Sequence, residues 1–271
     1  MISAGPQEAS QGSSLLQRVQ QYTSPSNWRS IAQILTSFVP FVVTWYLMLR
    51  SLQVSYWLTL LLAVFEAGFL VRIFIIQHDC GHGSFFRSRR ANDLVGSLLG
   101  VLTLTPYKSW RRQHAIHHAT SGNLDQRGVG DIQTLTVEEY RALSPWRKLL
   151  YRIYRHPALL FGAGAMTQFV VLYRTTLNVP RTWRSERLGV HWTNLGLVSL
   201  IAVLGELVGW RQFMLVQLPI TAISCSAGVW LFYVQHQFEN TYWERESKWD
   251  YSIAAIQGSS HYALPKVLQW F

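Results

Sequence analysis

The sequence is poor in charged residues, since Asp, Glu, Lys and Arg make up only 14% of its 271 residues. An ordinary soluble domain carries roughly 25%. Apolar side chains take the place of charge: 49% of the residues are hydrophobic and 14% are aromatic. This composition argues against a soluble globular domain and is typical of a protein embedded in a membrane.

Cysteine is scarce as well, with only Cys80 and Cys225. Two thiols cannot form a disulfide scaffold, so nothing requires an oxidising compartment. Residues 1–27 lack the basic start and short apolar core of a signal peptide, and we expect them to form a flexible polar tail in the cytosol. Because no Pro/Gly/Ser-rich linker divides the remainder, residues 28–271 are expected to form one membrane domain.

Long apolar runs predict transmembrane helices, which need about 20 residues each. The short connections at residues 50–54 and 209–212 predict that these helices pair as two hairpins. Two weaker runs, Leu94–Pro106 and Ala158–Tyr173, are expected to lie in the membrane interface. The four spanning runs are Ile31–Leu49, Ser55–Ile76, Trp192–Val208 and Phe213–Val234.

The net charge of +10 would suggest nucleic acid in a soluble protein, but here the basic residues flank apolar runs. Residues 77–157 contain 12 Lys or Arg, and the loop 174–190 is basic too. Positive loops favour the cytosolic side, so we predict four crossings with both loops in the cytosol. Within the runs, Arg72 can extend to the interface, whereas Glu66 and Glu206 predict polar contacts inside the bundle, with a substrate role as the alternative.

Six of the nine histidines are grouped at the predicted cytosolic helix ends. Positions three and four apart share one face of a helix, so each group presents several imidazoles together. Imidazole suits Fe, Zn, Cu or Ni, and so many imidazoles predict a site with more than one ion. The six predicted ligands are His78, His82, His114, His117, His118 and His236.

Acidic residues near these histidines are candidates for orienting them. A metal-bound imidazole usually donates its other N–H to a carboxylate or carbonyl. Ordinary roles as loop acids or helix caps are the alternative for each. The four candidates are Asp79, Asp125, Asp131 and Glu239.

Three segments, HDCGH (78–82), HAIHH (114–118) and HQFENTYW (236–243), resemble the membrane fatty acid desaturases, above all the bacterial acyl-lipid desaturases. The segments ANDLVGSLLGVLTLTPY, HHATSGNLDQRGVGDI and LTVEEY are similar to that group too. Together with the apolar runs, this likeness predicts an all-α integral membrane fold. Its four transmembrane helices form two hairpins, accompanied by interfacial helices and a cytosolic cap that carries the histidine boxes.

The resemblance implies a non-haem di-iron centre held by the six histidines, with O2 as co-substrate and two electrons per double bond. It implies a bacterial cell-membrane enzyme that acts on an acyl lipid or another carried acyl chain. Electrons would come from a carrier such as ferredoxin or a cytochrome b5-type protein. A basic cluster is its expected dock, with binding of anionic lipid as the alternative: Arg87, Arg89, Arg90, Arg111 and Arg112. An acyl tunnel is expected beside Phe85, Phe86, Trp110 and Trp243.

The sequence departs from the family at its C-terminal end. A third box of the form H-x-x-H-H is missing after His236, and His261 stands alone. We therefore expect a truncated chain that lacks part of one iron site and is inactive by itself. The alternatives are a related membrane hydroxylase or carotenoid ketolase, which use similar boxes, and a non-enzymatic membrane metal-binding protein.

Overall fold

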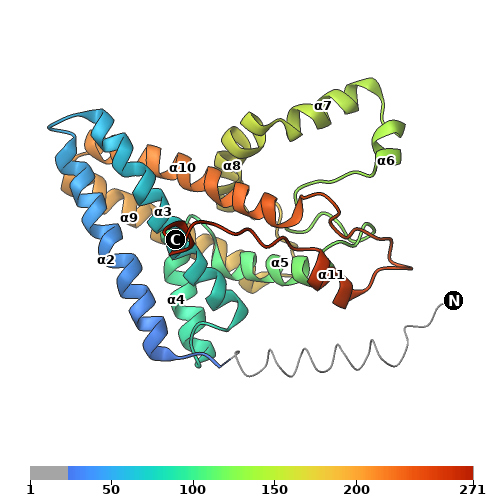
Figure 1. The fold of residues 1–271 in the computed structure, drawn as a ribbon. Coiled ribbons are helices and arrows are strands. Elements are labelled where there is room, and N and C mark those ends of the chain that lie inside the picture. The colour runs from blue at the N-terminus through green and yellow to red at the C-terminus, as the bar shows by residue number, and fades with distance from the viewer. Residues whose placement is uncertain (1–23, 271) are drawn as a thin grey trace.

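Four long helices dominate residues 24–270, the part of the chain that the computed structural model describes (Figure 1). Each is at least 25 residues long and apolar enough to cross a membrane, which confirms the predicted all-α membrane fold. The tail expected over residues 1–27 falls largely outside the described residues. The four helices are α2 (Asn27–Ser51), α3 (Tyr56–His82), α9 (Arg184–Val208) and α10 (Trp210–His236).

Short links join these helices in consecutive pairs, as the sequence predicts. Residues 52–55 connect α2 to α3. Gly209 alone connects α9 to α10, and its φ of 90° is a backbone conformation that favours glycine. α9 differs from the prediction because it begins at Arg184, well before the apolar run at Trp192. Helical backbone therefore continues past the apolar stretch into the basic loop.

Shorter helices fill the connections between the two hairpins and follow α10. Within residues 24–270 no strand is formed, and a single isolated parallel bridge joins Asn123 to Glu244. The short α-helices are α4 (Arg89–Leu102), α5 (Tyr107–Thr120), α6 (Val137–Ala142), α7 (Pro145–Arg155), α8 (Gly164–Met166) and α11 (Tyr251–Gln257). The π and 3-10 turns are η1 (Ala158–Ala163), η2 (Thr167–Val171), η3 (Leu172–Arg174) and η4 (Leu268–Trp270).

The stretch from η1 to η3 continues the chain after α7 with a sharp bend. The angle between α7 and Ala158–Arg174 is 61°. Taken together, these two segments also meet the length and hydropathy expected of a spanning helix. Residues 24–270 therefore contain four such helices, or up to five if the bent pair counts as one. The stretch itself packs against α10.

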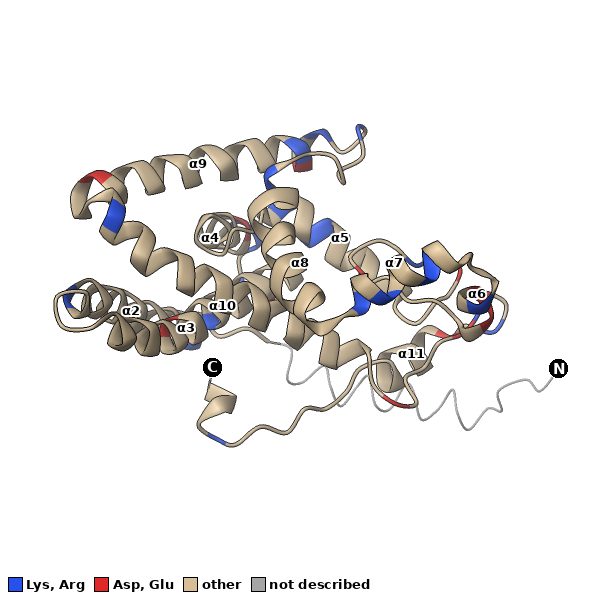
Figure 2. Cartoon of the chain, turned by 90° about the horizontal axis from the view of Figure 1, so that it is seen from above, with Lys and Arg blue, Asp and Glu red and all other residues tan. Residues whose placement is uncertain are grey.

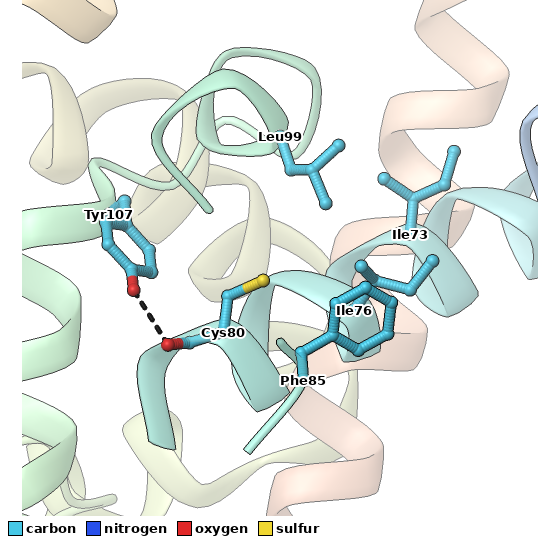
Figure 3. Packing of buried hydrophobic residues seen from close by; sticks show 6 residues of the cluster. All are labelled: Ile73, Ile76, Cys80, Phe85, Leu99 and Tyr107. Atoms are coloured by element: carbon cyan, nitrogen blue, oxygen red, sulfur yellow. Dashed lines mark hydrogen bonds between the residues drawn. The ribbon is translucent and has the colours of Figure 1, made fainter. Parts of the chain in front are cut away.

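A buried apolar cluster holds the end of α3 against α4 and α5 (Figure 3). Ile73, Ile76 and Cys80 of α3 meet Leu99 of α4 in this cluster. Tyr107, the first residue of α5, donates a hydrogen bond from its hydroxyl to the carbonyl oxygen of Cys80 at 2.8 Å. This contact fixes the last turns of α3 relative to the start of α5, the two helices that carry most of the grouped histidines.

Glu66 lies in the middle of α3 and is fully buried. Neither of its carboxylate oxygens has a hydrogen-bond partner among the described residues, so the predicted polar contact is not found. Glu206 does have one, since it accepts a hydrogen bond from Trp210 Nε1 at 2.9 Å. Arg72 donates from Nε to Ser37 Oγ at 2.9 Å, and its guanidinium lies over the ring of Trp270.

Most charged residues lie at helix ends, in loops and on the short helices (Figure 2). The sequence between Gly189 and Gly205 of α9 contains no charged residue, and α10 contains none after Arg211. The long helices therefore expose an apolar surface suited to lipid.

Candidate metal centre

All six predicted histidines come from the ends of three helices. His78 and His82 are in the last two turns of α3, which ends where Gly83 adopts a φ of 71°. The three histidines of the second box are in the C-terminal half of α5. His236 is the last residue of α10.

Four of these histidines form one compact group. One ligand nitrogen from each of His78, His82, His114 and His118 lies within 4.8 Å of the others. The Nε2 atom of His82 is 3.2 Å from that of His78 and 3.2 Å from that of His114. The Nε2 atoms of His114 and His118 are 3.0 Å apart. Nitrogens from two separate helices thus converge on one point.

His117 and His236 form a second, smaller group. Their Nε2 atoms are 3.2 Å apart, and the ring of His117 is almost fully buried. The ring centroids of His117 and His118 are 5.6 Å apart, so the two groups are adjacent. The second box therefore does not act as one unit, because His114 and His118 turn toward α3 whereas His117 turns toward α10.

The remaining ring nitrogens in three of the histidines already have partners. His78 Nδ1 lies 3.1 Å from Asp79 Oδ1, and His117 Nδ1 contacts Asp131 Oδ1. His236 Nδ1 lies 3.1 Å from the carbonyl oxygen of Gly258. An acceptor at Nδ1 fixes the proton on that nitrogen. The lone pair of Nε2 is then free and faces the Nε2 atoms of the neighbouring histidines. This pattern is the one that metal-bound histidines show.

The electrostatics of α5 also suit a metal. Burial and then the neighbouring imidazoles, His78 first, lower the pKa of His114 to about 2. Burial and then His82 lower the pKa of His118 to about 4. Both side chains are therefore neutral near pH 7, and neutral imidazole is the form that binds a metal. A set of clustered neutral imidazoles fits iron, zinc, copper or nickel.

Two of the four acidic candidates lie away from the histidines. Asp125 is exposed and accepts hydrogen bonds from Arg245 Nη1 at 2.6 Å and from the Glu246 amide at 3.0 Å. Glu239 is also exposed and lines an open hollow. Asp79 and Asp131 are the two that contact an imidazole.

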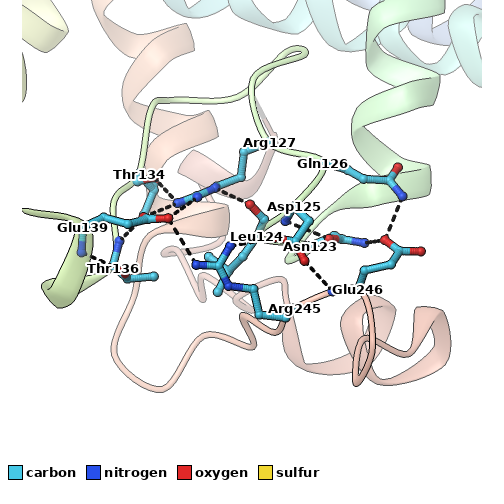
Figure 4. A network of polar contacts seen from close by, with 10 residues as sticks. All are labelled: Asn123, Leu124, Asp125, Gln126, Arg127, Thr134, Thr136, Glu139, Arg245 and Glu246. Carbon is cyan, nitrogen blue, oxygen red and sulfur yellow. Dashed lines mark hydrogen bonds and ion pairs between the residues drawn. The ribbon is translucent and has the colours of Figure 1, made fainter.

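Asp125 belongs to a polar network that joins the loop after α5 to residues 245–246 (Figure 4). Arg127 binds Glu139 through two hydrogen bonds, Nη2 to Oε1 at 2.7 Å and Nη1 to Oε2 at 2.9 Å. Asn123 Nδ2 donates to Glu246 Oε2 at 2.6 Å. Because Asp131 lies within the same loop, the network holds in place the segment that contacts His117.

A small cavity opens beside the His117 and His236 pair. Both histidines line it, together with Asp131 and Trp243. An adjoining hollow of about 460 Å³ is open to the outside and shares Gln237, Thr241 and Trp243 with the cavity. The two histidines line the small cavity but not the hollow.

The other residues predicted for the tunnel are placed differently. Trp110 stacks on His114 with ring centroids 4.6 Å apart. Phe85 is buried in the apolar cluster between α3 and α4, and Phe86 packs against that cluster. Of the four aromatic residues, only Trp243 lines the cavity or the hollow.

The predicted basic dock is partly neutralised. Arg111 pairs with Asp93, and Arg112 pairs with Glu186 at 2.8 Å. Arg87 donates from Nε to the carbonyl of Pro25. Arg89 and Arg90 remain exposed at the start of α4.

Sequence reasoning missed two contacts of the site. The carbonyl of Gly258 is a backbone group, so no side-chain pattern points to it. Tyr107 supports α3 through its hydroxyl group. Tyr107 is the first residue of the helix that carries the second box, and this position could have indicated a structural role near the site.

Comparison with known proteins adds to this geometry. The family described as fatty acid desaturase matches residues 51–271. A fatty acid desaturase of Bacillus subtilis is 51% identical over 256 residues, which cover 94% of this chain and 72% of that protein. The sn-1 oleoyl-lipid 12-desaturase of Anabaena variabilis is 26% identical over 230 residues, or 80% of this chain and 61% of that protein.

A third relative is the sn-1 acyl-lipid omega-3 desaturase (ferredoxin) of Synechocystis. It is 28% identical over 191 residues, which cover 68% of this chain and 52% of that protein. The chain thus spans between half and three quarters of the length of these relatives. Four apolar helices, with histidines from the ends of α3, α5 and α10 grouped together, define an integral membrane protein with a candidate metal site. The family match extends over most of the chain, which therefore belongs to the fatty acid desaturase family.

Proposed function

We propose that this protein desaturates acyl chains with O2 and two electrons at a di-iron centre held by its six grouped histidines. The observation that carries the proposal is the convergence of Nε2 atoms from α3, α5 and α10. Their arrangement as a group of four beside a pair supports two metal positions. Two bound iron ions would supply the activation of O2 that removal of two hydrogens from adjacent methylene carbons requires.

The chain's own residues hold and orient this centre. Asp79 and Asp131 keep the imidazoles of His78 and His117 in one tautomer, and the Gly258 carbonyl does the same for His236. Burial keeps His114 and His118 neutral at the pH of the cytosol. None of these groups needs to transfer a proton to the substrate.

The substrate we propose is an acyl chain linked to a lipid. Saturated methylenes offer no polar handle, so the depth of an apolar passage must select the carbons that react. The open hollow beside Trp243 adjoins the small cavity that His117 and His236 line, and the acyl chain is proposed to approach the histidines from this side. The names of the cyanobacterial relatives, which include acyl-lipid substrates, support this choice.

The centre is proposed to face the cytosol of a bacterial cell, where an acidic electron carrier can reach it. The basic residues between α3 and α9 favour this orientation. Arg89 and Arg90 are the exposed cations of the predicted dock. The carrier is proposed to be a ferredoxin or a cytochrome b5-type protein. The word ferredoxin in the name of the Synechocystis relative supports the first choice.

Expression in a host that lacks desaturases tests the proposal, with the complete parent gene beside residues 1–271, which are expected to be inactive by themselves. Analysis of membrane lipids should reveal acyl chains with a new double bond in the strain that carries the parent gene. The variant His114→Ala should abolish that product, whereas His191→Ala, at an exposed histidine of α9, should retain it. Acyl chains carrying added oxygen, or a double bond that persists in His114→Ala, would contradict the proposal.

A further inference from the structure

Helix α7 exposes an apolar face that no other described part of the chain covers. Trp146 is 64% exposed, and Leu149, Leu150 and Ile153 are each 45–47% exposed. These positions are spaced by three, four and seven residues, so they lie on one side of the helix. A stripe of four large apolar side chains on an 11-residue helix is not a random scatter of surface residues.

The rest of α7 is basic. It carries Arg147, Lys148, Arg152 and Arg155 and no acidic residue, and Figure 2 shows the blue segments along it. Arg147 follows Trp146, and Arg152 precedes Ile153, so a cation lies at each edge of the apolar face. A helix with this pattern is typical of binding to an anionic membrane surface.

The opposite face of α7 is bound to the part of the protein that carries the histidines. The Tyr154 hydroxyl accepts a hydrogen bond from the Gln133 amide at 3.1 Å, and the Tyr151 hydroxyl accepts one from the Leu135 amide at 3.4 Å. Arg155 Nη2 donates to Gln237 Oε1 at 3.0 Å, next to His236. These contacts orient α7 so that its apolar face points away from the protein.

We propose that α7 lies on the bilayer surface, with its apolar face among the upper acyl chains and Arg147 and Arg152 at anionic lipid headgroups. The axis of α7 makes an angle of 61° with that of Ala158–Arg174, so α7 can lie along the membrane surface while the following segment points in another direction. Long cationic side chains at the edge of an apolar face can reach headgroups while their stems cover apolar surface. This lipid contact is independent of the chemistry proposed for the histidines. It anchors the segment after Asp131 and the end of α10 to the membrane.

A fluorophore on α7 tests the proposal in the whole protein reconstituted in nanodiscs. Leu149→Cys places the label on the apolar face, and Lys148→Cys places it on the opposite side. Cys80 and Cys225 are buried, and labelled wild-type protein gives their background. Nitroxide attached to the upper acyl chain should quench the label at residue 149, and only weakly the label at residue 148. Quenching should be stronger with phosphatidylglycerol than with phosphatidylcholine alone.

Charge variants separate the anionic contact from packing. In the Leu149→Cys background, Arg147→Glu with Arg152→Glu should shift the lipid-bound equilibrium by about tenfold or more toward the unquenched state. Arg147→Lys with Arg152→Lys keeps the charges but removes the hydrogen bond from Arg152 Nε to the Tyr140 hydroxyl, and it should retain the quenching.

Several results would overturn the proposal. Equal quenching at both label positions, or equal quenching in the two lipids, would exclude this surface contact. Stronger quenching by nitroxide at the acyl-chain terminus would place α7 in a spanning segment. Shielding of the label by a second copy of the protein, or by an added acidic carrier protein, would assign the face to another partner.

Discussion

The Nε2 atoms of His117 and His236 lie 3.2 Å apart, although 119 residues separate the two positions in the sequence. His117 belongs to α5 and His236 to the end of α10, so the pair exists only where α5 meets the end of the second hairpin. The group of four differs, because it needs only α3 and α5. The two candidate metal positions therefore depend on different parts of the fold.

Removing the carboxylate that contacts His117 should weaken metal binding by the His117 and His236 pair. Asp131 fixes the imidazole through Nδ1, and loss of such a contact typically lowers metal affinity by about 10–100-fold. We expect Asp131→Ala to show this loss in titrations with Fe²⁺ under anaerobic conditions, measured as bound metal per protein.

Asp125→Ala is the matched control, since Asp125 lies six positions earlier in the same loop and pairs with Arg245. Its metal affinity should remain close to that of the wild type. Equal losses in the two variants would mean that loop integrity, rather than the contact with His117, controls binding.

The sequence predicted which histidines would meet but not how they would divide. Helical spacing places His114, His117 and His118 near one another, and the structure keeps them adjacent. Their division between α3 and α10 depends on the position of His236, which comes from a distant helix. Their roles as metal ligands stay predictions. Among the acids, position in the sequence did not separate Asp131 from Asp125, because the direction of each side chain depends on how the loop folds.

The fold was more predictable than the site, because long apolar runs have few alternatives to transmembrane helices. What the runs did not reveal was the amphipathic helix α7, since its apolar face amounts to only four residues within a basic segment. The environment of Glu66 was also misjudged. A carboxyl group at that depth predicts a partner, and no hydrogen-bond partner exists among the described residues.

Gly96 of α4 leaves room for the Tyr107 ring of α5. A Cβ atom at this position would overlap that ring, which is itself buried and donates a hydrogen bond from its hydroxyl to the carbonyl oxygen of Cys80. We expect Gly96→Ala to destabilise the protein by about 1–3 kcal/mol, as overpacking of a filled core does. Thermal unfolding in detergent measures this change.

Gly162→Ala is the control for that substitution. A Cβ atom there has nothing within 4 Å, so the melting temperature should not fall. If Gly96→Ala melts at the wild-type temperature as well, the ring of Tyr107 moves aside without cost, and the contact does not hold α4 against α5.

The network around Arg127 should loosen in acid. The hydrogen bonds from Arg127, and then the one from the Thr136 amide, lower the pKa of Glu139 from 4.5 to about 2. Because the folded-state pKa is depressed, the stabilisation is complete above about pH 4.5 and is lost as the pH falls toward 2. The protection of residues 123–136 against hydrogen exchange, measured relative to the intrinsic rate at each pH, should therefore fall over that range.

Glu139→Gln should remove most of this pH dependence, because the segment should have low protection at every pH in the range. Glu138→Gln changes the neighbouring exposed residue of α6 and should leave the profile as in the wild type. A profile that is unchanged in Glu139→Gln would show that another group controls the segment.

Glu66 provides the sharpest test of what a buried carboxyl group does in this bundle. Its side chain is fully buried on α3, and neither oxygen has a hydrogen-bond partner in the described chain. An unsatisfied buried polar group costs about 1–3 kcal/mol, so Glu66→Met should raise the melting temperature. Glu206→Met removes an acceptor that Trp210 uses and should not stabilise. If Glu66→Met stabilises the protein but abolishes the double-bond product, the carboxyl group serves the reaction at the expense of stability. If it lowers the melting temperature instead, Glu66 contributes a favourable interaction to the folded bundle.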